Sequence, residues 1–313
     1  MTIKFNFYDI YGFALPGFLL LAVLWLPFGL IDNRWPDAEF SSALLGVILA
    51  YFAGHVLQQV AGQAIPSNFL SGRYPSSVFL DKDDPSPTFS REFKERLAHQ
   101  ILTVFQLDIS LDAVGKAADG VRRDAFFLCR SALIKSKTAV YPEQFEGLYA
   151  LMRGLCAAFG LAVVYYLGWA YSGLLHRTVP SAFGSWQWSG LAVLGGIVIA
   201  SFALVTGDRL KDSKDEYSKK VVKYCKSVMI VSLLGAVFAA GYYLGLSSVK
   251  VSEHRDQLIA AAVLSFFASE RCYAGYKAFA QEFAKAVYRD FSNYEKPAEH
   301  PRANPNHDTE AEL

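Results

Sequence analysis

The sequence predicts an all-α, polytopic membrane protein with about six transmembrane helices and a helical cytoplasmic cap. Of its 313 residues, 53% are hydrophobic and only 19% are charged, whereas soluble domains carry roughly 25% charged residues. The charges are absent from several apolar runs that are long enough to cross a hydrocarbon core of about 30 Å. One of these runs, residues 41–63, has no formal charge and shows the most regular pattern in the chain.

The first predicted span covers residues 11–31 and is interrupted by Pro16 and Pro27. A membrane helix tolerates proline when neighbouring groups satisfy the carbonyls that it frees. No small-residue cleavage site precedes the polar turn that follows, which favours a retained anchor over a signal peptide. Residues 1–63 are therefore expected to form the first two transmembrane helices, joined by a loop over residues 32–40.

The second span, residues 41–63, carries two stripes. Small or polar residues recur at every fourth position, at Ser42, Gly46, Ala50, Gly54, Gln58 and Gly62. Side chains four residues apart lie above one another, so this face is a groove that another helix can approach closely. The packing residues predicted in this groove are Gly46, Ala50 and Gly54. A polar stripe runs beside it and comprises Tyr51, His55, Gln58, Gln59 and Gln63.

The polar stripe is the main candidate site, because polar groups in a span usually face a bundle interior or a water-filled cavity. His55 has three interpretations: an interhelical hydrogen bond that fixes packing, a proton relay or pore gate, or metal ligation. No second metal ligand lies at helical spacing, so we predict no metal site. Gln58, Gln59 and Gln63 carry the same alternatives.

Residues 64–148 form a polar insert with its own helices. Ser90 is a plausible N-cap for a helix over residues 91–106, and Ser110 or Asp112 for a second helix that ends near Ser136. The apolar face predicted for the second helix is Val114, Ala118, Val121, Ala125, Leu128 and Ala132. The acidic segment 81–88 is interpreted as a solvated loop, with a divalent-cation site as the alternative.

Pro142 is expected in the first turn of a helix that leads into the membrane. The third and fourth spans, within residues 149–206, cover residues 155–175 and 188–206. Arg153 is predicted to be an interface anchor at the entry of the third span. The fourth contains Gly196 in a row of small residues, and the fifth, residues 228–246, contains the pair Gly241 and Gly245.

The sixth apolar segment, residues 257–269, is short for a span. Hydropathy alone would make it interfacial or buried, but its helical pattern continues beyond Arg271, which favours one long helix that crosses the membrane at its start and projects into the cytoplasm over residues 271–294. Residues 228–270 would then hold the fifth span and this short sixth one. Residues 295–313, rich in Pro, Asn, Glu and His, are predicted to be a disordered tail.

Residues 207–227 are predicted to be a basic cytoplasmic loop with seven Lys and Arg residues. The three outer loops of a six-span arrangement, residues 32–40, 176–187 and 247–256, together hold four. Lysine and arginine favour the cytoplasmic side, so both termini are expected inside. The loop either contacts anionic headgroups, through Lys219, Lys220 and Lys223, or serves only as a topology signal.

The remaining residues argue against several classes of function. The four cysteines are widely spaced without a CxxC pair, which indicates free thiols rather than a zinc site. Lys plus Arg (30) nearly balances Asp plus Glu (29), which gives no indication of a nucleic-acid partner. No nucleophile–base arrangement and no glycine-rich phosphate loop is recognisable, so we predict a protein that is not an enzyme and has no cofactor.

Three stretches, YDIYGFALPGFLLL (residues 8–21), AYFAGHVLQQV (50–60) and YKAFAQEFAKAVYRDF (276–291), resemble a pattern in uncharacterised bacterial inner-membrane proteins. Some proteins of this kind accompany phage-defence or abortive-infection systems. The resemblance implies a location in the bacterial inner membrane and a membrane effector or sensor, and it implies no catalytic residue.

Three functions follow as hypotheses: a membrane-perturbing or pore-forming effector, a membrane scaffold or sensor that recruits a soluble partner through its cap, and a transporter subunit. The small-residue faces exceed what one intramolecular contact needs, so a homo-oligomer in the lipid bilayer is expected.

Overall fold

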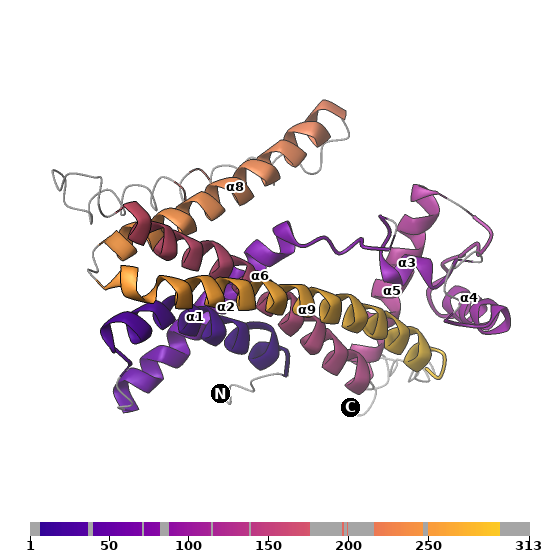
Figure 1. Ribbon diagram of the computed structural model, residues 1–313. Coiled ribbons are helices and arrows are strands. Elements are labelled where there is room, and N and C mark those ends of the chain that lie inside the picture. Colours follow the sequence, from indigo (N-terminus) through magenta and orange to yellow (C-terminus); the bar gives the residue numbers. More distant parts are fainter. Residues whose placement is uncertain are drawn as a thin grey trace, which may run out of the picture. The chain divides into compact units, whose positions relative to one another are not determined.

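The computed structural model describes residues 7–36, 40–70, 72–81, 88–113, 115–137, 139–175, 196, 199, 216–246 and 250–294. These residues form helices and connecting segments without a β-strand (Figure 1). The helices are η1 (Asp9–Ala14, a π-helix), α1 (Leu15–Asp32), α2 (Phe40–Ala64), α3 (Pro75–Val78), α4 (Arg91–Phe105), α5 (Lys116–Lys135), α6 (Val140–Leu175), α8 (Glu216–Leu246) and α9 (Val251–Phe291). The all-α prediction is therefore confirmed.

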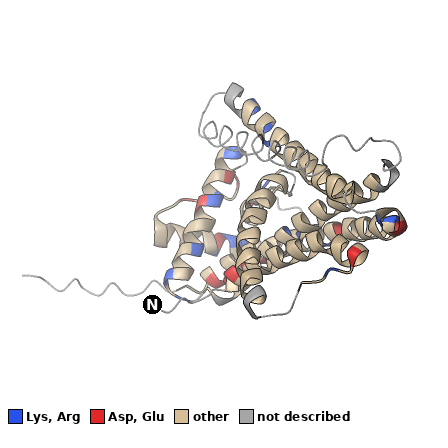
Figure 2. Cartoon of the chain, turned by 90° about the vertical axis from the view of Figure 1, so that its left-hand side faces the viewer, with Lys and Arg blue, Asp and Glu red and all other residues tan. Residues whose placement is uncertain are grey.

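Five helical segments in the described part of the chain are long and apolar enough to cross a membrane: Asp9–Asp32, Ala43–Ala64, Tyr141–Ser172, Lys220–Leu246 and Val251–Phe291. They coincide with five of the six predicted spans. Figure 2 shows long stretches of helix without a charged side chain. The predicted fourth span, residues 188–206, lies outside the described residues except for Gly196 and Ile199, which are both helical.

The predicted helix ends differ most where the sequence offers no strong local signal. Pro142 lies in the first turn of α6, as predicted, and this helix continues without a break through the predicted third span. Helix α8 begins at Glu216, so the second half of the predicted basic loop is helical. Helix α9 is one continuous element of 41 residues, which confirms the long helix predicted across the short apolar segment. The predicted tail lies outside the described residues.

The chain divides into two compact units. Unit 1 comprises Met1–Pro75 and Tyr141–Phe283, and unit 2 comprises Ser76–Val140 and Ala284–Leu313. Helix α9 thus contributes to both. The first segment of unit 2, Ser76–Val140, lies within the residues of the predicted insert, 64–148.

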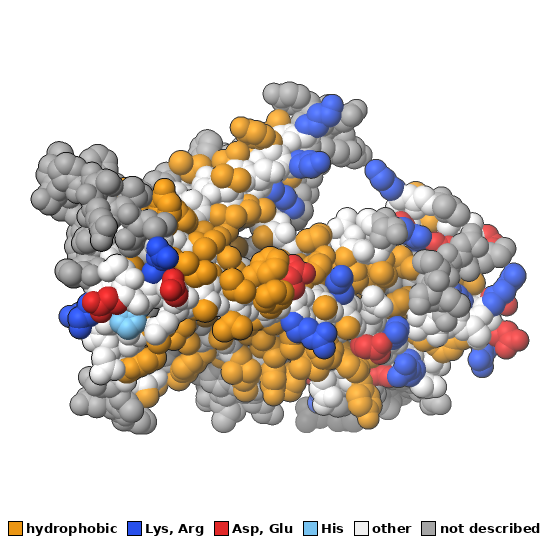
Figure 3. All heavy atoms as spheres, viewed as in Figure 1, with side chains coloured by type: hydrophobic (Ala, Val, Ile, Leu, Met, Phe, Trp, Pro, Cys, Tyr) orange, Lys and Arg blue, Asp and Glu red, His pale blue; other side chains and the backbone are white. Residues whose placement is uncertain are grey.

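Helix α6 is the element that joins the other helices of unit 1. The hydroxyl groups of Tyr165 and Tyr166 donate to the carbonyl oxygens of Leu24 and Val23 in α1, at 3.2 and 3.0 Å. Ser269 Oγ of α9 donates to the Cys156 carbonyl oxygen at 3.0 Å. On the face shown in Figure 3, hydrophobic side chains form a broad surface, as expected of helices that lie in lipid.

Unit 2 packs α3, α4 and α5 against the last turns of α9. Ser90 caps α4, because its Oγ accepts a hydrogen bond from the Phe93 amide at 3.2 Å, as predicted. Helix α5 begins at Lys116 rather than at Ser110 or Asp112, after Gly115 with φ of +115°. A side chain is strained at that dihedral, so glycine interrupts the helical pattern there.

The buried face of α5 also differs from the predicted one. Its buried residues are Arg122, Ala125, Phe126, Cys129 and Leu133, whereas Leu128 is exposed. The predicted apolar face did not contain Arg122, and a charged residue is rarely buried without a partner. The tertiary structure supplies those partners.

Candidate functional site

Gln58 is the centre of the predicted polar stripe, and it lies at a junction of three helical segments of unit 1. Only 5% of Gln58 is exposed. Its Nε2 donates to the carbonyl oxygens of Gly12 in η1 and Ala150 in α6, both at 2.7 Å. Its Oε1 accepts from Nε and Nη2 of Arg153, at 3.1 and 2.9 Å. A glutamine amide offers two donors and two acceptor sites, so every hydrogen-bonding position of Gln58 is used.

Pro16 explains why the Gly12 carbonyl is available. Proline has no N–H and therefore cannot donate to the carbonyl four residues earlier. In η1 that carbonyl belongs to Gly12, and the Gln58 side chain supplies the missing donor from another helix. A carbonyl freed by proline in a membrane helix needs a donor from a neighbouring group. Gln58 is that donor for Gly12.

Close approach at this junction depends on glycine. A Cβ atom added to Gly154 of α6 would lie 2.7 Å from Pro16 Cβ and 2.8 Å from Gln58 Nε2. Arg153 also lies over the Tyr149 ring, with its guanidinium carbon 5.4 Å from the ring centroid. The sequence indicated Arg153 only as an interface anchor, and its pairing with Gln58 carries no local signal because the two residues are far apart in the chain.

The other members of the polar stripe do not share this junction. The His55 ring stacks on Phe13 with a centroid distance of 3.7 Å and meets the Tyr51 ring edge-on at 4.6 Å. Gln59 is exposed, whereas Tyr51, His55 and Gln63 are half-buried. The stripe therefore divides into buried Gln58, the aromatic pair Tyr51 and His55, exposed Gln59 and half-buried Gln63.

The predicted groove on α2 is occupied by the first helical segment over part of its length. Ala50 and Gly54 are buried, and a Cβ atom at Gly54 would overlap the Phe13 carbonyl oxygen. Gly46 and Gly62 have nothing within 4 Å of such a Cβ. The groove thus has a filled middle and two open ends.

The predicted glycine pair on α8 packs against α6. A Cβ atom at Gly241 would overlap the Tyr165 carbonyl oxygen, and one at Gly245 would overlap Ser172 Oγ. Gly196 lies near α8, where its added Cβ would be 2.5 Å from Ala236 Cβ. These three predicted packing residues therefore lie at close helix contacts within unit 1.

The residues predicted to contact lipid headgroups lie in the first turns of α8. Lys220 and Lys223 are exposed, and the side chain of Lys219 lies outside the described residues. Tyr224 beside them is 71% exposed, while Cys225 and Met229 are buried on another side of the helix. This arrangement is compatible with a basic, membrane-surface end of a spanning helix.

Unit 2 contains a second site that sequence reasoning missed. Arg122 of α5 is 1% exposed, and its Nη2 donates to the carbonyl oxygens of Ser110, Leu111 and Ala113 at 3.2, 3.1 and 2.9 Å. Its Nη1 lies 3.5 Å from Asp81 Oδ2 and 3.8 Å from Asp119 Oδ1. The carboxylates compensate the buried charge, and the guanidinium fixes an irregular segment.

The first residue of the predicted acidic loop, Asp81, is buried rather than solvated. This residue is buried beside Arg122, and its carbonyl oxygen accepts a 2.5 Å hydrogen bond from Lys94 Nζ. Residues 82–87 lie outside the described part of the chain. Among the described residues, no group of three or more His, Cys, Asp or Glu side chains is arranged to hold a metal ion.

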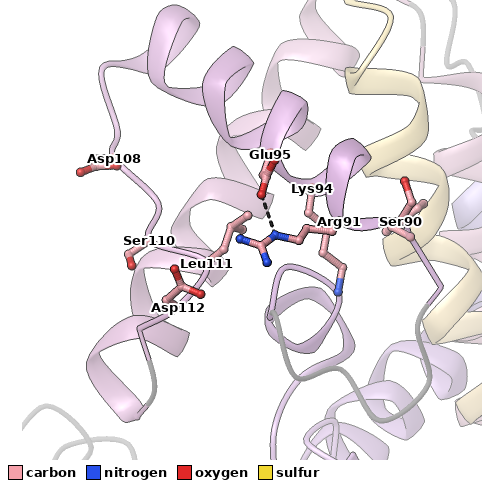
Figure 4. A pocket seen from close by; sticks show the side chains of 9 residues that line it. Ser90, Arg91, Lys94, Glu95, Asp108, Ser110, Leu111 and Asp112 are labelled. Atoms are coloured by element: carbon pink, nitrogen blue, oxygen red, sulfur yellow. Dashed lines mark hydrogen bonds and ion pairs between the residues drawn. The ribbon is translucent and has the colours of Figure 1, made fainter.

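The segment fixed by Arg122 forms one wall of a cavity of about 550 Å³ (Figure 4). The opposite wall is the start of α4, where Arg91 Nε donates to Glu95 Oε1 at 2.7 Å. This hydrogen bond, together with the Glu95 charge, raises the pKa of Arg91. The cavity lies among the residues Phe89, Ser90, Arg91, Lys94, Glu95, Asp108, Ser110, Leu111 and Asp112.

Comparison with protein-family models, with curated proteins and with solved structures finds no match to this chain. The function is therefore inferred from the two sites described above.

Proposed function

We propose that this protein is a membrane scaffold or sensor, in which the apolar helices of unit 1 anchor unit 2 for recruitment of a soluble partner. The observation that supports this function best is the complete use of Gln58. A residue whose donors and acceptors are all engaged between helices holds a bundle together, and it offers no position for a permeating ion or a relayed proton.

The properties of unit 2 are a second line of support for the proposal. It is compact, it has a buried ion-pair centre at Arg122, and its cavity is bordered by charged residues of both signs. Buried charges are costly and are repaid only by good geometry. Their use to fix a cavity wall fits a binding module that must keep its shape.

The proposed setting is the bacterial inner membrane with both termini in the cytoplasm, because basic residues gather in the regions assigned to that side. We also propose a homo-oligomer. Gly46 and Gly62 leave room on α2, and the exposed large apolar residues of this helix include Leu45, Phe52 and Val56.

An effector of antiviral defence that perturbs the membrane is the second candidate. The observation that favours it is the exposure of Gln59, which lies next to the open position of Gly62. If two or more copies met at this face, Gln59 and the half-buried His55 would line a polar path between them.

The two candidates differ in what the wild-type protein does to a membrane. The test is controlled expression in a bacterium with recording of membrane potential and dye entry, for the wild type and a His55→Ala, Gln59→Ala double variant at equal membrane levels. A scaffold leaves the potential unchanged in both. Depolarisation by the wild type alone would refute the scaffold and establish the effector.

A further inference from the structure

The cavity in unit 2 is lined by charges of both signs (Figure 4). The start of α4 contributes Arg91, Lys94 and Glu95, and the segment that precedes α5 contributes Asp108 and Asp112. Phe89 and Leu111 add apolar surface. A volume of about 550 Å³ falls within the range of small-ligand sites, roughly 300–1,000 Å³.

Arg91 lines this cavity as an exposed side chain beside Glu95. Its Nε donates to Glu95 Oε1 at 2.7 Å, as an i,i+4 pair on the surface of α4. Figure 4 shows the guanidinium directed toward Leu111 and Asp112. Within the described part of the chain, its two terminal nitrogens make no hydrogen bond. They form the planar fork that binds a carboxylate with two parallel hydrogen bonds.

The backbone that carries Asp112 is held in place before a ligand binds. Arg122 holds three carbonyl groups of residues 110–113 from the protein interior, and Asp81 and Asp119 balance its charge. An irregular segment held in this way loses little conformational freedom when a ligand binds, and this raises affinity.

The charges define the chemistry of the ligand. A multiply charged anion would meet the carboxylates of Glu95, Asp108 and Asp112. A purely cationic ligand would meet Arg91, whereas the Lys94 ammonium is buried and donates to the Asp81 carbonyl oxygen. A molecule that carries one carboxylate and one ammonium group satisfies both walls, with its carboxylate on Arg91 and its ammonium on the aspartates.

We propose that this cavity binds a zwitterionic α-amino-acid group, as a free amino acid or a short peptide. The apolar surface of Phe89 and Leu111 would then receive the ligand side chain. The role of this ligand as the signal of a sensor rests on the proposed function, whereas its binding to unit 2 does not.

The test uses the full-length protein in detergent micelles or lipid nanodiscs. The probes are the proteinogenic amino acids and glycylleucine, together with the N-acetylated and C-amidated derivative of each probe that binds. Binding is measured by calorimetry and by the shift of the melting temperature. We expect at least one zwitterion to bind, and each singly charged derivative to bind about tenfold or more weakly, a loss of about 1.4 kcal/mol.

Variants then locate the site. Arg91→Gln and Asp112→Asn are each expected to weaken binding about tenfold or more. Arg96→Gln and Glu92→Gln are the matched controls, because both residues are exposed on α4 and do not line the cavity. Arg91→Lys keeps the charge without the fork, and it serves as the second variant if Arg91→Gln fails to fold.

Three results would overturn the proposal: no probe binding up to roughly 10 mM, equal binding of the singly charged derivatives, or unchanged binding in both cavity variants. The outcome is separable from that of the proposed function. Zwitterion binding by a protein that depolarises cells would leave the site standing and refute the scaffold. A scaffold that recruits its partner without binding any probe would refute the site alone.

Discussion

Replacing Gln58 by leucine tests whether the polar junction stabilises the bundle. The substitution removes two donated and two accepted hydrogen bonds. Hydrogen bonds between transmembrane helices average about 0.6 kcal/mol, so four of them amount to roughly 2.4 kcal/mol. The Gly12 carbonyl adds the cost of an unsatisfied buried group, about 1–3 kcal/mol, whereas half-buried Arg153 can turn toward headgroups.

We therefore expect Gln58→Leu to lower the free energy of unfolding by roughly 3–5 kcal/mol. The measurement is unfolding in mixed micelles of dodecyl maltoside with increasing dodecyl sulfate, followed by circular dichroism. Gln59→Leu is the matched control, since Gln59 is exposed one position along the same helix; we expect a change within about 0.5 kcal/mol. A Gln58→Leu protein as stable as this control would show that the junction does not hold the helices together.

Three further predictions concern other contacts. Gly54→Ala, whose Cβ would overlap the Phe13 carbonyl oxygen, should cost about 1–3 kcal/mol by forcing the helices apart, whereas Gly46→Ala, with open space, should be neutral or stabilising in the same unfolding assay. Arg122→Ala should destabilise unit 2 by about 3–5 kcal/mol, because buried carboxylate charge is left uncompensated; limited proteolysis of unit 2 at the wild-type rate would contradict this. Burial raises the pKa of the Cys129 thiol, so the folded state keeps this proton above pH 8.5, where the unfolded thiol loses it. Stability should therefore fall as pH rises above about 8.5, by at most about 1.4 kcal/mol per pH unit from this group, and an identical pH slope in Cys129→Ala would exclude that contribution.

Elements with strong local determinants were predicted correctly. The Ser90 cap and the first-turn position of Pro142 depend on a few neighbouring residues, and the structure confirms both. The start of α5 was wrong because the apolar pattern continued through Gly115, whose positive φ interrupts the helix. Hydrophobic periodicity alone does not show where a helix starts, and here the conformation of Gly115 sets the start of α5.

The candidate sites were likewise predictable only where the signal is local. The polar stripe on α2 was visible as a pattern, but which of its members was buried was not. Gln58 and Gln59 are neighbours with the same side chain, and only the arrangement of η1 and α6 makes one a buried junction and leaves the other exposed. The sequence pattern does not indicate that Arg122 is buried, because the carboxylates that stabilise it there come close only when the chain folds.

The sequence by itself determined that this chain is helical and that its long apolar segments suit a membrane, because period, length and charge are local properties. Only the tertiary structure decided which helix fills the groove on α2, which glutamine replaces the donor missing at Pro16, and which arginine fixes the cavity wall in unit 2. Those outcomes depend on pairs of residues tens of positions apart. Their energies arise only when packing brings donors to acceptors and removes both from their surroundings.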